Sequence, residues 1–107
     1  MNDPGPYRII LSDRATANLK SIFQYIAEDS PQNASSMVDR ILGAMENLKL
    51  FPHRTVVESR NAGLKHPVRS LPVQSYVIFF RVLEKQQIVR ILQVRHGAQR
   101  RPKRFGH

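Results

Sequence analysis

Five arginines in the second half of the chain are spaced so that a folded sheet could gather them. Arg69, Arg81 and Arg95 fall within or at the ends of runs of strand length, and Arg100 and Arg101 follow soon after the last run. Because the guanidinium group is planar and donates two parallel hydrogen bonds, arginine suits phosphate and carboxylate partners. We therefore predict a continuous basic patch at one end of a sheet, although each arginine taken alone also fits an ordinary surface side chain.

His96 is the one histidine beside this predicted patch. Neighbouring cations disfavour the charged imidazolium, which leaves the neutral ring as a base or a hydrogen-bond donor, and a plain surface histidine fits the sequence equally well. The four histidines show no metal-ligand spacing, the chain has no cysteine, and it contains no P-loop, dinucleotide-binding turn or nucleophile elbow. The sequence thus predicts no metal site and no cofactor.

The positive charge is confined to one half of the chain. The first 53 residues contain five basic and six acidic side chains, whereas the rest contains twelve basic ones against only Glu58 and Glu84, and the net charge is +9. Such asymmetry gives one side of a domain a positive field that attracts a polyanion or an acidic protein surface. A solvated surface without a partner is the alternative interpretation.

The length and composition suit one soluble domain. We expect a single domain over residues 1–107, because 107 residues leave no room for a second core, and no apolar run approaches the roughly 20 residues that cross a bilayer. Residues 1–6 are turn-rich and unlike a secretory signal, so they are expected to form a disordered leader, and residues 98–107 a basic tail. Together with the lack of cysteine, these features favour a cytoplasmic protein without membrane contact.

Two helices are predicted in the first half of the chain. Apolar residues recur every three to four positions over residues 13–29 and 31–50, and Ser12 and Ser30 are suitable N-caps. The very short break between the two segments predicts an antiparallel helical hairpin.

The strands are predicted over residues 7–11, 66–71, 76–83 and 88–95, with an irregular segment over 52–65. The run over 76–83 is apolar on both faces and is expected in the interior of the sheet, whereas Pro67 and Pro72 push the preceding run towards an edge. This order predicts an α+β fold of two layers, in which an N-terminal strand and an antiparallel helical hairpin pack on a small, mainly antiparallel sheet (β-α-α-β-β-β).

Several segments of the chain carry a resemblance to a known family. They are Ser12-Asp13-Arg14-Ala15, Leu48-x-x-Phe51-Pro52, Arg69-Ser70-Leu71-Pro72, Tyr76-Val77-Ile78-Phe79-Phe80-Arg81-Val82 and His96-Gly97-Ala98-x-Arg100. Together they resemble the ParE/RelE superfamily of toxins from bacterial type II toxin–antitoxin modules, and are closer to its ParE-like class. The resemblance runs from about residue 7 to residue 100 and implies the two-layer fold and a cognate antitoxin partner.

The superfamily contains two functional classes. ParE-like toxins inhibit DNA gyrase, so the resemblance implies a gyrase inhibitor without catalytic residues, which would contact its target through Arg69, Arg81, Arg95, His96, Arg100 and Arg101. RelE-like toxins cut mRNA on the ribosome, and this alternative would use Glu58 and His96 as an acid–base pair, with Arg69 and Arg81 holding the charged transition state. The sequence departs from the RelE pattern because no tyrosine follows Tyr76.

The predicted helices offer an apolar surface to the antitoxin. We expect the contacts to involve Leu19, Ile22, Phe23, Ile26 and Met45, because an exposed apolar stripe on a helix pair is a common partner site. Packing against the protein's own core is the competing interpretation of the same stripe.

Overall fold

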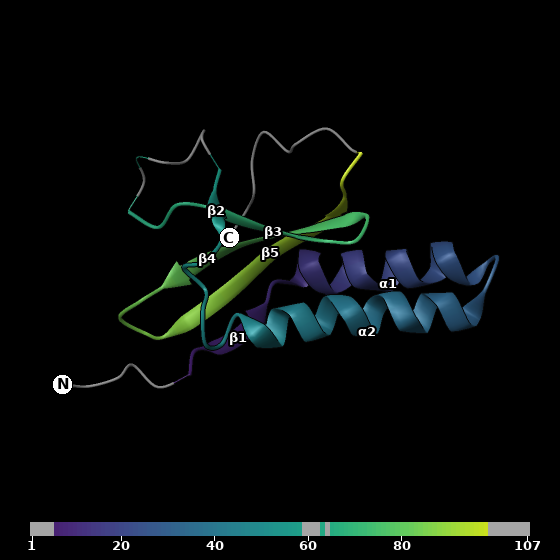
Figure 1. Ribbon diagram of the computed structural model, residues 1–107, viewed down its shortest axis with the longest axis horizontal. Coiled ribbons are helices and arrows are strands. Elements are labelled where there is room, and N and C mark those ends of the chain that lie inside the picture. Colours follow the sequence, from purple (N-terminus) through teal and green to yellow (C-terminus); the bar gives the residue numbers. More distant parts are fainter. Residues whose placement is uncertain (1–5, 59–62, 64, 99–107) are drawn as a thin grey trace.

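The chain forms two layers, a five-stranded sheet and a pair of helices packed on one of its faces (Figure 1). The computed structural model describes residues 6–58, 63 and 65–98. The elements in chain order are β1 Arg8–Leu11, α1 Asp13–Ala27, α2 Pro31–Asn47, β2 Val56–Val57, β3 Arg69–Val73, β4 Tyr76–Leu83 and β5 Ile88–His96. This α+β architecture confirms the fold predicted from the sequence.

Both helices begin where the serine N-caps predict. The Ser12 side chain accepts a hydrogen bond from the Ala15 N–H at 3.0 Å, and the Ser30 side chain accepts one from the Asn33 N–H at 3.2 Å. The helices end two and three residues earlier than predicted. After Ala27 and after Asn47 the chain continues in tighter turns, which the apolar periodicity does not distinguish from helix. Neither helix in the described part of the chain is long and apolar enough to cross a membrane.

The sheet has the strand order β1-β5-β4-β3-β2. β1 runs parallel to β5, and the other neighbours are antiparallel, so the sheet is mixed but mainly antiparallel. Strand β4 has the predicted bounds and lies in the centre of the sheet, which explains why it is apolar on both faces.

The edge beyond β3 differs from the prediction. The short strand β2 lies within the segment expected to be irregular, and it pairs with Arg69 and Ser70 only. Pro72 lies beyond that pairing, where β3 is the edge of the sheet and a missing N–H costs no ladder hydrogen bond. The expectation of an edge strand is therefore wrong for the first half of β3 and right for its second half.

The two faces of the sheet carry different apolar clusters. Alternate residues of β4 (Tyr76, Ile78, Phe80 and Val82) pack with the helices in the main core. The residues between them, Val77 and Phe79, form a smaller buried cluster on the other face with Val68 and Leu92. The pairing of β4 with β5 shifts between Phe79 and Phe80, and this bulge leaves Leu92 as the extra residue of β5.

Ser12 joins the helical layer to the sheet. Its hydroxyl donates a 2.8 Å hydrogen bond to the Leu92 carbonyl at the bulge, just past the last pair of β1 and β5 (Leu11 with Ile91). Two residues further along β5, the Asn18 side chain accepts from the Val94 N–H at 3.0 Å. β1 pairs only with the first part of β5. Beyond it, side chains at the start of α1 form the hydrogen bonds to the free edge of β5.

We expect Ser12→Ala to lower the free energy of unfolding by about 2 kcal/mol, because it removes an N-cap and leaves the buried Leu92 carbonyl without this donor. The matched variant Ser30→Ala removes an exposed N-cap alone and should cost about 1 kcal/mol. Urea unfolding of both variants measures the difference. Equal losses would show that the bond from Ser12 to β5 contributes nothing.

Candidate target-binding surface

Three arginines lie on the sheet face that the helices leave uncovered. In β4, Arg81 alternates with the core residues Phe80 and Val82 and therefore points to the opposite side. The register places Arg81 directly across from Arg90, and Arg95 across from Val77. Arg81, Arg90 and Arg95, which we call the arginine face, thus share one side of the sheet.

Arg90 was not among the residues predicted from the sequence. Its place on the same face as Arg95 becomes evident from the register, since β5 changes its alternation at the bulge between them. Period-two alternation within β5 was the available signal, because Arg90 lies between the core residues Val89 and Ile91.

The arginines of this face lie against apolar surface. The Nε atoms of Arg81 and Arg95 are buried and have no hydrogen-bond partner within the described part of the chain. One end of the Arg95 guanidinium donates to the Gln93 side chain at 3.4 Å. Their stems therefore pack on the sheet, while both side chains remain only partly buried and can present charge to a partner.

Arg69 does not join the arginine face. Its register with Phe80 places it on the helix side of the sheet, where its Nη1 donates to the Thr55 carbonyl at 3.0 Å and to the His53 carbonyl at 3.5 Å. The sequence prediction of one continuous patch is therefore wrong for this residue, because neighbouring strands can place their arginines on opposite faces. Arg100 and Arg101 lie outside the described residues.

His96 lies at the end of β5 against Tyr76. The two rings meet edge to face with centroids 5.3 Å apart, and the His96 Nδ1 accepts a hydrogen bond from the Ala98 N–H at 3.0 Å. A proton on the neutral ring therefore sits on Nε2. Burial raises the pKa of the Tyr76 hydroxyl, and the nearby Tyr25 raises it further, so the Tyr76 phenol stays neutral near pH 7.

A cavity of about 440 Å³ opens beside this ring pair. Tyr25 and Ser21 of α1 line it together with Tyr76 and His96. No local sequence pattern indicates this cavity, because it forms only where residues of α1 meet the ends of β4 and β5.

The structure does not bring Glu58 and His96 together. The Glu58 N–H bonds the Val68 carbonyl, next to the Arg69–Phe80 pair, whereas His96 pairs with Tyr76. Along β4, Phe80 and Tyr76 are four residues apart, which corresponds to about 13 Å. Across the sheet, β2 and β5 are separated by three strand spacings of about 4.8 Å each. The two side chains therefore cannot act on one scissile bond as an acid–base pair in this conformation.

The residues predicted to meet an antitoxin divide into buried and exposed ones. Ile22 and Met45 are 8% and 2% exposed and belong to the main core, against which Leu19 and Ile26 also pack. Phe23 is 38% exposed, so it alone of the five offers substantial free surface on the helices. Among the described residues, no group of three histidine or acidic side chains could hold a metal ion.

A helical hairpin on a five-stranded sheet with a basic open face defines the chain as a small two-layer α+β protein. The chain matches the family described as the ParE toxin of type II toxin–antitoxin systems over residues 9–101. It therefore belongs to the ParE toxin family. No curated protein matches it.

Solved structures share the fold. A chain of the chromosomal ParDE toxin–antitoxin system from P. aeruginosa is 20% identical with a TM-score of 0.66, covering 84% of this chain and 95% of its own length. A chain of the RelBE2 toxin–antitoxin complex from Mycobacterium tuberculosis is 20% identical with a TM-score of 0.63 and covers 92% and 100%. The free RelE toxin mutant of E. coli is 11% identical with a TM-score of 0.62 and covers 87% and 85%. At these identities the likeness establishes the two-layer fold that ParE and RelE proteins share.

Proposed function

We propose that this ParE family member inhibits DNA gyrase and that a cognate antitoxin neutralises it. The observation that carries the proposal is the chemistry of the arginine face. It offers cations beside a buried apolar cluster, and on strands β3, β4 and β5 no carboxylate or phenol shares that face with them. Such a surface can bind a polyanion or an acidic protein surface, and these three strands give it no group that moves protons.

The antitoxin partner follows from the family and from the exposed apolar side chains of the helical layer. Family membership supports a partner encoded with the toxin, as in the ParDE system. Phe23 of α1 and Leu42 of α2 are 38% and 40% exposed, which suits an apolar segment laid on the helices.

Ribosome-dependent cleavage of mRNA is the second candidate function, and the observation that favours it is the position of His96 in the cavity that Tyr25 and Tyr76 also line. An imidazole in such a cavity can protonate a leaving oxygen, while the phenol hydroxyls can donate hydrogen bonds to the phosphate. This candidate would have to obtain its base from a group other than Glu58.

Purified protein should inhibit gyrase supercoiling or trap cleaved DNA, and should leave mRNA on programmed ribosomes intact. Both assays measure a covalent or topological change in the nucleic acid. Binding alone would not distinguish the two functions, because a net charge of +9 favours binding to any nucleic acid. His96→Gln serves as the matched variant and should retain gyrase inhibition. Ribosome-dependent cleavage that disappears in His96→Gln, with gyrase unaffected, would establish the second candidate instead.

A further inference from the structure

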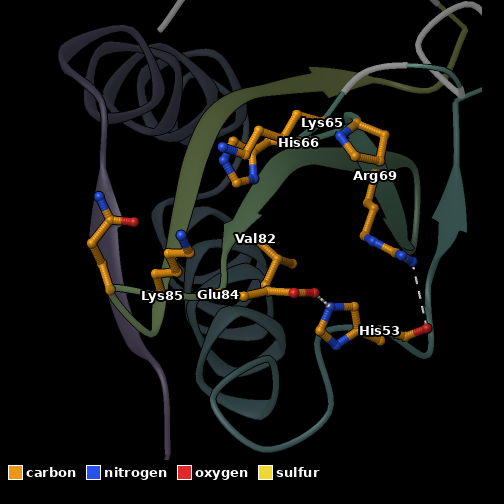
Figure 2. Close-up of a pocket in the computed structure, with 9 residues that line it drawn as sticks. His53, Lys65, His66, Arg69, Val82, Glu84 and Lys85 are labelled. Atoms are coloured by element: carbon orange, nitrogen blue, oxygen red, sulfur yellow. Dashed lines mark hydrogen bonds and ion pairs between the residues drawn. The ribbon is translucent and has the colours of Figure 1, made fainter.

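A second basic site lies on the helix side of the sheet, beyond the end of α2. A cavity of about 330 Å³ is open there, within the range of roughly 300–1,000 Å³ found for ligand pockets. Three segments distant in sequence line it: the segment after α2, the one leading into β3, and the one at the end of β4. The lining residues are His53, then Lys65, His66, Pro67 and Arg69, then Val82, Glu84, Lys85 and Gln86. Figure 2 shows their side chains around the cavity.

The charge of this cavity is strongly positive. Lys65, Arg69 and Lys85 line it, and Glu84 is the single acidic residue among the lining side chains. Glu84 is engaged by His53, whose Nε2 lies 2.8 Å from its Oε1 (Figure 2). Lys65 and Lys85 form no hydrogen bond or ion pair within the described part of the chain, so their charges are available to an anion.

One wall of the cavity is held in place before any anion arrives. Arg69 donates to the carbonyls of His53 and Thr55, and the His53 ring packs edge-on against Tyr7 with centroids 6.3 Å apart. These contacts tie the segment after α2 to β3, and the His53–Glu84 pair ties it to the end of β4. A wall that is already ordered loses little conformational entropy when a ligand binds against it.

The cavity also has an apolar part. Val82 and Pro67 line it together with the His66 imidazole, and none of these groups competes for a phosphate oxygen as strongly as the lysines. The cavity thus has a basic part and an apolar part, and a molecule that joins a phosphate to a flat, weakly polar ring matches both. Phosphate oxygens would face the basic side chains, and the ring would lie against Val82, Pro67 and His66.

We propose that this cavity binds a mononucleotide, with its phosphate held by Lys65 and Lys85. The site is separate from the arginine face, because Arg69 lies on the opposite side of the sheet from Arg81. The inference is also independent of gyrase inhibition.

Titration of the purified full chain with AMP, followed by NMR, tests the proposal. Shifts should concentrate in residues 53, 65–69 and 82–86, and adenosine, which lacks the phosphate, should bind at least about tenfold more weakly. Lys85→Gln should weaken AMP binding by about tenfold, since it removes one charge-assisted hydrogen bond. Lys20→Gln is the matched control, because Lys20 is an exposed lysine on α1 and its loss changes the net charge equally.

Three results would overturn the proposal: no saturable AMP binding at millimolar concentration, equal weakening by Lys20→Gln and Lys85→Gln, or shifts that map to Arg81, Arg90 and Arg95. The last result would show that AMP follows general charge to the arginine face. Because neither lysine variant alters that face, gyrase inhibition measured in parallel is unaffected, and the two proposals fail or succeed separately.

Discussion

Substitution of Arg81, Arg90 and Arg95 by glutamine should abolish growth inhibition while the protein remains folded. All three side chains lie on the open face of the sheet, and those of Arg81 and Arg95 rest on apolar neighbours with a buried Nε that finds no partner in the described structure. Each charge-assisted contact with an anionic target is worth about 1.5 kcal/mol or more, so loss of all three should weaken target binding about 1,000-fold.

The same substitutions should cost little stability. Arg81 and Arg90 stand directly opposite each other on adjacent antiparallel strands, and like charges in that position are destabilising. A buried Nε without a partner is a further cost that glutamine relieves. We therefore expect the melting temperature to stay within a few degrees of the wild type.

Growth on induction, thermal melting and gyrase inhibition are the measurements. The control replaces Arg14, Lys20 and Arg40 by glutamine, since these exposed residues of the helical layer carry the same total charge. This control should remain toxic. If the two triple variants lose toxicity equally, net charge rather than the arginine face determines the activity.

The fold was largely predictable because its elements have local signals. The two serine N-caps, the apolar periodicity of the helices and the doubly apolar run of β4 each appear within a short window of sequence. Strand β2 has no such signal. Two residues, Val56 and Val57, cannot display an alternation, and their strand exists only because β3 offers them a partner.

The arginine face was predictable only in part, because a face of a sheet depends on register. Arg81 could be assigned from its parity with Val77 and Phe79, but Arg69 lies on the other side because it pairs with Phe80. Arg90 escaped notice because the bulge at Leu92 reverses the alternation of β5 between Arg90 and Arg95. The predicted acid–base pair of Glu58 and His96 does not form for a related reason. The strand order separates the two residues, and no local sequence pattern encodes that order.

Phe23→Asp should make the toxin insensitive to its antitoxin. Phe23 is 38% exposed on α1, whereas its neighbour Ile22 is 8% exposed and packs in the core, so Phe23 can contact a partner without disturbing the fold. Truncation of an aromatic residue at the centre of an interface costs 2 kcal/mol or more, and a buried carboxylate adds to that loss. We expect antitoxin affinity to fall by at least about 30-fold.

Gln24→Asp is the matched control for this experiment. Gln24 is exposed on the same helix. Its replacement by aspartate therefore introduces the same charge, at a similar helix-propensity cost of a few tenths of a kcal/mol. Co-purification with the antitoxin and rescue of growth by antitoxin expression measure the outcome. Phe23→Asp should stay toxic in the presence of antitoxin, and Gln24→Asp should be rescued. Full rescue of Phe23→Asp would place the antitoxin on another surface, and loss of toxicity in that variant without antitoxin would mean that Phe23 serves the target instead.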